Sequence, residues 1–264
     1  MNHIEPPAGE PLQLNPLSAV LITRNAAAIL EPCLDSLAFA DEIVVVDSAS
    51  TDATAELAAR KGARVVQKEW LGFGRQRQFA VEQASHDWVL CVDADERVSP
   101  ELARCIESAL VAPVSPVFRM ARRFRFLGRW LAHGEGYPDW NVRLFDRRRA
   151  RWSDDAVHEH VVAQGTVERL PGDLLHASAE SIDDYVAKQN RYTSLQAEAM
   201  HARGERAGLA RLALSPLARF LRFYVVKLGF LDGAAGFAHI AIGAFASFLK
   251  YAKLRALNAR DGGR

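Results

Sequence analysis

Acidic side chains directly follow an apolar segment near the middle of the sequence. Residues 87–93 read DWVLCVD, and Ala94, Asp95 and Glu96 come next. If 87–93 is a strand, Asp93 and Asp95 lie where ligands bind in open α/β sheets, beyond the carboxyl ends of the strands. Two such carboxylates can bind a hard divalent cation, which in turn can hold a diphosphate by its oxygens. No cluster of thiols and imidazoles accompanies them, so the pattern favours Mg²⁺ or Mn²⁺ over zinc.

A second acidic position follows another apolar segment. Residues 42–47 read EIVVVD, and they place Asp47 at the same predicted sheet edge. A carboxylate there can accept hydrogen bonds from a ribose or from a base imide. Asp52 is either part of that ligand site or a cap of the following helix, and both interpretations stay open. The glycine-rich motifs of dinucleotide-binding and P-loop proteins are absent, which disfavours both classes.

Alternating strands and helices must position these side chains. Short apolar segments predict strands at 18–23, 42–47, 64–67 and 87–93, and the segments between and after them predict helices at 26–38, 50–59, 75–84 and 99–110. This alternation is typical of a doubly wound α/β sheet. Beyond residue 113 the pattern predicts further strands, and from 181 to about 203 it predicts a helix.

Length, composition and charge are those of an ordinary globular protein. The 264 residues fit one or two domains, and 33 Lys and Arg against 32 Asp and Glu give a net charge of +1. That balance gives no reason to expect a nucleic-acid partner. The three cysteines have no paired metal-binding spacing, which fits a reducing compartment. The first 16 residues have neither a basic start nor an apolar core, so we expect a leader that is not a signal peptide and a cytoplasmic protein.

The last part of the chain is basic and apolar together. Residues 201–264 hold 11 Lys and Arg against 3 Asp and Glu, and 228–249 are largely apolar. The apolar stretch is long enough to cross a bilayer, but Asp232, His239 and four glycines interrupt it. We therefore expect a helical hairpin that lies in the plane of an anionic membrane surface. The alternative is a packed helical subdomain of a soluble protein.

Several blocks of the sequence resemble glycosyltransferase family 2. They are SAVLITRN, EIVVVDSASTDAT, WLGFGRQRQFA and DWVLCVDADERVSPEL. Later blocks, among them DWNVRLFDR, DDAVHEHV and FYVVKLGFLDGAAGF, resemble the bacterial lipopolysaccharide-core group of β-1,4-glucosyltransferase type. The resemblance covers about residues 18–255 and implies a GT-A fold and the transfer of a sugar from a nucleotide diphosphate, here UDP-glucose. It predicts a leader (1–16), a GT-A domain (17–180, with a donor half at 17–112 and an acceptor half at 113–180) and a helical membrane-associating region (181–264).

The resemblance also implies roles for individual residues. Asp47 matches the nucleotide-contacting aspartate, with Asp52 beside it, and Arg77 matches a basic contact to the donor. Asp93 and Asp95 match the D-x-D motif, whose metal bridges the donor phosphates. Thr23 and Asn25 match the substrate-binding loop after the first strand. The chain departs from the group at three positions, where Ala26 replaces the usual acidic residue and Ala49 and Ala53 replace glycines.

An inverting transfer needs a base for the acceptor hydroxyl. Glu159 matches the family's V-H-E element and is the first candidate, and Asp155 is the second. The alternative is that these carboxylates pair with the arginine-rich run at 147–151. Because related transferases often add a late histidine to the metal, His158 and His176 are candidate metal ligands.

Arginines alternate with aromatic residues over residues 118–130. The set comprises Arg119, Arg122, Arg123, Arg125 and Arg129 with Phe118, Phe124, Phe126 and Trp130. Arginine suits phosphate groups, so the segment predicts contact with a phosphorylated, lipid-linked oligosaccharide acceptor, although the same alternation also fits a half-buried strand. The resulting hypothesis is a peripheral, metal-dependent glucosyltransferase at the inner face of the inner membrane. The alternatives are transfer to polyprenyl phosphate and a non-catalytic nucleotide-sugar-binding protein of the same fold.

Overall fold

The computed structural model describes residues 14–155, 159–177 and 181–261. The chain divides into two compact units. The first comprises the residues up to Arg122 together with Trp140–His176, and the second comprises Arg123–Asp139 together with the residues from Ala177 onward. The predicted leader lies outside the described residues up to position 13, and Asn15 at its end hydrogen-bonds the carbonyl oxygen of Leu110 at 2.7 Å.

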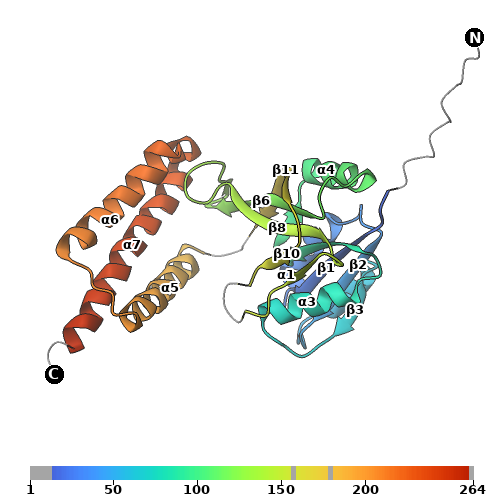
Figure 1. Ribbon diagram of the computed structural model, residues 1–264, viewed down its shortest axis with the longest axis horizontal. Helices are drawn as coiled ribbons and strands as arrows, with labels where there is room; N and C mark the ends of the chain where they lie inside the picture. The colour runs from blue at the N-terminus through green and yellow to red at the C-terminus, as the bar shows by residue number, and fades with distance from the viewer. Residues whose placement is uncertain (1–13, 156–158, 178–180, 262–264) are drawn as a thin grey trace, which may run out of the picture. The chain divides into compact units, whose positions relative to one another are not determined.

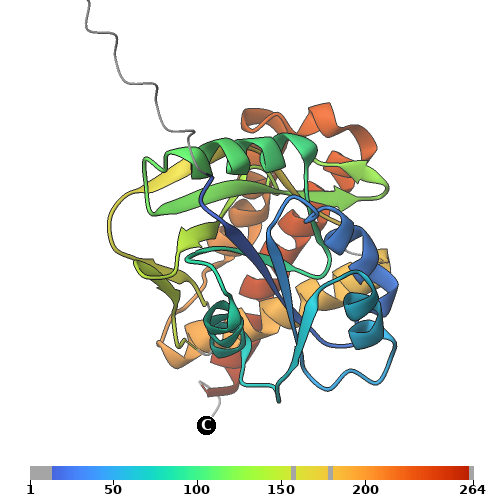
Figure 2. The same cartoon turned by 90° about the vertical axis from the view of Figure 1, so that its right-hand side faces the viewer.

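The first unit is built on a parallel sheet. Its parallel strands are β1 (Leu17–Thr23), β2 (Glu42–Asp47), β3 (Arg64–Gln67) and β4 (Trp88–Asp93). These are the four strands that the sequence predicts, and the central β1, dark blue in Figure 2, pairs with both β2 and β4. The register aligns Thr23 with Asp47, and Ile22 with Asp93. The carboxyl ends of three strands therefore meet at one edge.

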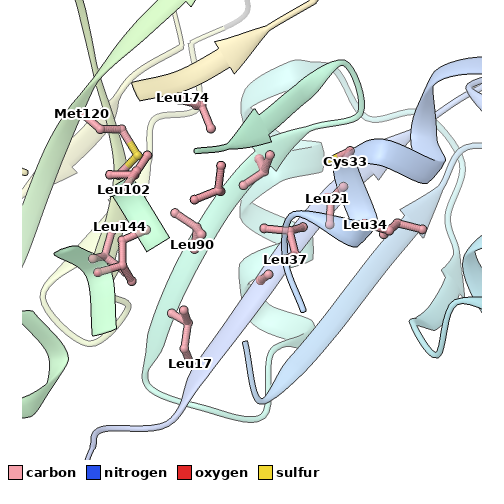
Figure 3. Close-up of a cluster of buried hydrophobic side chains, with 14 of the residues drawn as sticks. Leu17, Leu21, Cys33, Leu34, Leu37, Leu90, Leu102, Met120, Leu144 and Leu174 are labelled. Carbon is pink, nitrogen blue, oxygen red and sulfur yellow. The ribbon is translucent and has the colours of Figure 1, made fainter. Parts of the chain in front are cut away.

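Helices cover both faces of this sheet, as the alternating pattern predicts. They are α1 (Ala27–Asp35), α2 (Thr54–Arg60), α3 (Phe73–Gln83) and α4 (Pro100–Val111). Successive β1 side chains point to opposite faces, so Leu21 packs with residues of α1 and α4, whereas Val20 packs with Ala80 of α3. Figure 3 shows the larger of the two cores, which includes Leu34, Leu90 and Leu102. Burial on both faces explains the continuous apolar segments in the sequence.

Further strands extend the sheet beyond β4. They are β5 (Glu96–Val98), β6 (Val117–Phe126), β7 (Arg129–Trp130), β8 (Asp139–Asp146) and β11 (Val167–His176). Across the described residues the order is β3-β2-β1-β4-β8-β6-β11-β5, with β7 paired to β6. A separate ribbon joins β9 (Ala150–Trp152) to β10 (Val161–Ala163). The unit is the mixed α/β sheet expected of a GT-A fold.

Three long helices form most of the second unit. They are α5 (Ile182–Ala202), α6 (Leu209–Leu221) and α7 (Gly233–Asp261). A π-helical turn, η1 (Arg222–Val226), and a 3-10 turn, η2 (Gly229–Asp232), connect α6 to α7. Helix α7 packs against both α5 and α6 (Figure 1). The expected helical hairpin is thus present as α6 and α7, and its membrane contact stays a prediction.

The apolar stretch at 228–249 does not form one uninterrupted helix. It starts with Leu228 in the left-handed region (φ 56°), continues through η2 and enters α7 at Gly233. Buried Asp232 explains this break, because its carboxylate accepts the backbone N–H groups of Ala132 and His133 at 3.0 and 2.8 Å. Among the described helical segments, only Gly229–Asp261 is long and apolar enough to cross a membrane, and 44% of its apolar window is buried in the protein.

The hairpin at 123–139 groups with the helices of the second unit. Besides the Asp232 contacts, Arg219 of α6 pairs with Glu135, and Arg129 donates to the carbonyl oxygen of Leu231 at 3.0 Å. The sequence assigns the same hairpin to the acceptor half of the catalytic domain. In the structure, polar contacts between residues far apart in sequence join this hairpin to the C-terminal helices, and no local pattern reveals such contacts.

Candidate active site

Asp47 lies buried at the edge where β1, β2 and β4 end. Its exposed fraction is 1%, and its Oδ1 accepts a hydrogen bond from Thr23 Oγ1 at 3.1 Å. Its Oδ2 accepts from the backbone N–H of Ser50 at 2.9 Å. The parallel register brings Thr23 and Asp47 together, as their shared assignment to the donor site requires.

Asn25 and Asp52 belong to the two loops at this edge. Asn25 has a positive φ of 51°, and its side chain accepts the N–H of Thr51 at 2.8 Å, which joins the loop after β1 to the loop after β2. Asp52 accepts the N–H of Thr54, the first residue of α2, and the N–H of Ala27, each at 3.1 Å. These are cap-like contacts, so they support the structural interpretation of Asp52.

Ala49 stands where the resemblance implies a glycine, and its backbone conformation is one that favours glycine. Its φ is 54°, in the left-handed region that residues with a Cβ adopt at a cost of about 1–2 kcal/mol. The loop nevertheless forms, held by the contacts of Asp47 and Asn25 with Ser50 and Thr51. Ala53 has an ordinary φ of −75°, so alanine fits there without strain.

Asp95 and His176 form a carboxylate–imidazole pair. Asp95 Oδ2 lies 2.9 Å from His176 Nε2, and their side chains are 30% and 12% exposed. Antiparallel pairing of β5 with β11 places His176 opposite Glu96 and so brings it beside Asp95. The carboxylate oxygen suits Mg²⁺ and Mn²⁺ alike, whereas the imidazole nitrogen favours Mn²⁺ over Mg²⁺, which prefers oxygen ligands. Within the part of the chain that the structure describes, no group of three or more such side chains forms a closed site, so further ligands would have to come from substrate oxygens or water.

Asp93 contacts arginine side chains. Arg77 of α3 donates to both of its carboxylate oxygens at 2.8 and 3.0 Å, and Arg143 of β8 donates to Oδ2 at 2.8 Å. The other guanidinium nitrogen of Arg77, Nη1, donates to Glu159 at 2.6 Å. The structure thus brings together three predicted residues, Arg77, Asp93 and Glu159, in one ion-pair network.

The surroundings of Asp93 and Glu96 shift their pKa values in opposite directions. Burial raises the pKa of both carboxyls. For Asp93 the charges of Arg143 and Arg77 outweigh burial and hold the pKa well below its usual range. For Glu96, which is fully buried, burial and the charge of Asp93 outweigh Arg143, so its pKa is raised. Asp93 therefore stays ionised at neutral pH.

Sequence reasoning missed Arg143 and gave Glu96 no role. Arg143 is 4% exposed and donates to Glu96 Oε1 at 2.8 Å as well as to Asp93. Glu96 Oε2 accepts the backbone N–H of Asp93 at 3.0 Å, which orients the start of the D-x-D turn. The available signal was a charged residue in the middle of the apolar strand segment NVRLFD, because a fully buried arginine requires carboxylate partners.

Glu159 lies against the start of α3. A Cβ added to Gly74 would meet the carbonyl oxygen of Ser153 at 2.5 Å and the Glu159 Cβ at 3.3 Å. Glycine at position 74 therefore lets the segment that carries Glu159 approach α3 closely, where Arg77 can reach its carboxylate.

We expect Gly74→Ala to lower sugar transfer more than it lowers stability, because the added methyl displaces Glu159 from its partner Arg77. A shift of about 1 Å at a reacting group can cost ~100-fold in rate. Gly208→Ala is the matched control, since a Cβ there meets nothing within 4 Å. Steady-state kinetics and thermal unfolding of both variants measure the effect, and equal rates in the two would contradict it.

Two predicted site residues, Asp155 and His158, are not among the described members of the ion-pair network around Arg77. Asp155 is 56% exposed and pairs with His160 at 3.4 Å. His158 lies outside the described residues. The alternative, pairing with the run at 147–151, is seen among the described residues for Asp154, which lies 3.7 Å from Arg151, whereas Arg147 and Arg148 pair with Asp87.

Comparison with known proteins decides the family. The family described as "Glycosyl transferase family 2" matches residues 18–164. The "Lipopolysaccharide core biosynthesis glycosyltransferase LpsC" of Rhizobium meliloti (strain 1021) is 36% identical over 256 residues, which cover 93% of this chain and 95% of that protein. The chain belongs to glycosyltransferase family 2. The predicted family and the α/β fold are thereby confirmed, and the protein is an enzyme that uses a nucleotide-sugar donor.

Another relative and a solved structure are also similar to this chain. An uncharacterized glycosyltransferase of Rickettsia bellii (strain RML369-C) is 33% identical to this transferase over 259 residues, covering 92% of this chain and 87% of that one. A crystal structure of glucosyl-3-phosphoglycerate synthase from Mycobacterium tuberculosis with Mn²⁺, UDP-glucose and phosphoglyceric acid covers 42% of this chain and 44% of its own, with 27% identity and a TM-score of 0.37. The two relatives from Rhizobium and Rickettsia extend over nearly the whole transferase, C-terminal helices included.

Proposed function

We propose that this transferase moves glucose from UDP-glucose to a lipopolysaccharide core oligosaccharide in a metal-dependent, inverting reaction. The observation that carries the proposal is the Asp95–His176 pair at the carboxyl edge of the sheet, in a chain that is 36% identical to a lipopolysaccharide core transferase over nearly its full length. The direct test is a panel of nucleotide sugars, with purified core oligosaccharide as acceptor and transfer read by mass spectrometry. Transfer from another donor alone would contradict the choice of UDP-glucose.

In this proposal, nucleotide binding and metal binding fall to different residues. Thr23, Asn25 and Asp47 lie at the strand ends and bind the nucleotide. Asp95 and His176 would hold Mg²⁺ or Mn²⁺, which when bound offsets the negative charge of the diphosphate leaving group.

On the acceptor side, Glu159 takes the proton of the attacking hydroxyl. Arg77 orients the Glu159 carboxylate through its Nη1, and its Nη2 is held in turn by Asp93. Asp155 is the second candidate for the base.

We also propose that the enzyme works on the cytoplasmic face of the inner membrane, because its acceptor is lipid-linked. Exposed apolar residues cluster at the turn between α6 and α7, where Val226 is 74% exposed and Phe230 45%. Arg222 and Lys227 lie among them, and neither has an ion-pair partner in the described part of the chain. Each basic residue near an anionic leaflet contributes about 1 kcal/mol, and inserted apolar residues add a term that salt does not weaken.

The wild-type protein should therefore co-sediment with anionic vesicles and be released only in part by high salt. The double variant Val226→Glu/Phe230→Glu should bind at least ~10-fold more weakly, because two acidic side chains replace the inserting groups. Val114→Glu changes a residue of the first unit that is 84% exposed and is the matched control. A wild-type protein that ignores anionic vesicles at low salt would exclude the membrane location.

A further inference from the structure

An apolar groove of about 290 Å³ lies between α5 and α7 in the second unit. Its lining includes Val186 and Asn190 of α5 and Ala241, Ile242, Phe245 and Leu249 of α7. None of the lining residues is among those assigned to sugar transfer, all of which belong to the first unit.

The two helices are packed closely at one end and leave the groove open farther along. Ala197 and Met200 of α5 form a buried cluster with Tyr251 and Leu254 of α7. About two turns before that cluster in α7, Phe245 is 55% exposed. An apolar wall left open to water in this way marks a place where a ligand or partner binds.

A positive charge lies at the edge of the groove. Lys253 Nζ is 2.6–2.8 Å from four oxygen atoms, contributed by Asn190, Thr193 and Ser194, and all four are uncharged. Within the described ranges no carboxylate pairs with this ammonium group, so its charge is not neutralised. Because Asn190 both lines the groove and contacts Lys253, the apolar slot and the cation are adjacent.

We propose that this groove binds one hydrocarbon chain of an anionic lipid, with the acidic headgroup next to Lys253. A hydrocarbon chain covers the apolar lining, and a phosphate or carboxylate neutralises the lysine. The identity of the ligand as a membrane lipid rests on the membrane location proposed above. The lipid bound in this groove is a different molecule from the lipid-linked acceptor, and the groove takes no part in sugar transfer.

The test uses the full-length protein and dodecyl phosphate below its aggregation concentration. Isothermal titration should show saturable binding of one molecule per chain. Dodecyl maltoside, with the same chain and no charge, should bind about tenfold more weakly, and inorganic phosphate alone should give no saturable binding. No sugar nucleotide is present, so the result does not depend on the proposed reaction.

Variants locate the binding. Ala241→Phe fills the groove and should weaken dodecyl phosphate binding at least tenfold, whereas Ala234→Phe, on the exposed part of α7 outside the groove, should not. Val186→Phe fills the groove from α5 and replaces the first variant if that one does not fold. Lys253→Gln should abolish the preference for dodecyl phosphate over dodecyl maltoside.

Four outcomes would overturn the proposal, and the first three concern the groove variants, the ligand and the oligomeric state. The first is unchanged binding of dodecyl phosphate in both groove-filling variants. The second is saturable binding of inorganic phosphate, which has no hydrocarbon chain. The third is closure of the groove by self-association of the protein, seen as a concentration-dependent dimer by light scattering. A wild-type protein that binds anionic vesicles but not dodecyl phosphate would reject the groove and leave the membrane location intact.

Discussion

Replacing Asp95 by alanine should lower the turnover number for sugar transfer at least ~100-fold, the scale of one lost electrostatic stabiliser of the leaving group. The side chain removed is the carboxylate 2.9 Å from His176 at the carboxyl edge of the sheet. His176→Ala should give a smaller loss together with a higher metal concentration for half-maximal rate, since the carboxylate remains. Steady-state rates over a titration of Mn²⁺ and Mg²⁺ measure both effects.

Asp87→Ala provides the control for this experiment. Asp87 comes directly before β4, whereas Asp95 lies beyond its other end, and Asp87 forms an ion pair with Arg148. Its loss removes a surface carboxylate with little expected effect on rate or stability. Full transfer activity of the wild-type enzyme in excess chelator would refute the metal-dependent mechanism, whatever the variants do.

Glu159→Gln should leave donor binding intact and reduce transfer by about 10²–10⁴-fold, because the amide keeps the shape of the side chain and cannot accept a proton. Arg77 holds Asp93 through Nη2 and Glu159 through Nη1, and glutamine can still accept a hydrogen bond from Nη1, so the donor side of the site should keep its geometry. Titration with UDP-glucose measures binding, and single-turnover transfer measures chemistry. Asp155→Asn is the comparison, and if it abolishes transfer while Glu159→Gln does not, Asp155 is the base.

Local pattern predicted the first half of the chain well. The strands before Thr23, Asp47 and Asp93 are continuous apolar segments bounded by polar turns, and such segments identify buried parallel strands without knowledge of tertiary contacts. From that arrangement the meeting of Thr23 with Asp47 at one sheet edge follows directly. The position of α4 was also predictable, because Ser99 caps it and Pro100 occupies its first turn.

The electrostatic network could not be predicted in the same way. Arg143 is 50 residues from Asp93, and Glu159 is 82 residues from Arg77. Their meeting depends on antiparallel strands added to the sheet after β4 and on a segment that packs against α3 at Gly74. Sequence spacing carries no information on such pairings. The sequence identified the D-x-D motif, but the distribution of its carboxylates between arginines and a histidine emerged only from the fold.

The pairing of β5 with β11 has a consequence for biosynthesis. Asp95 and His176 are 81 residues apart, so at about 5–20 residues per second the ribosome supplies the histidine several seconds after the aspartate. By then all four parallel strands have been synthesised. Non-local pairing of this kind forms slowly because a long loop must close first. The nascent chain can therefore build the sheet edge that carries Thr23, Asp47 and Asp93 early, whereas the Asp95–His176 pair forms only when β11 joins the sheet.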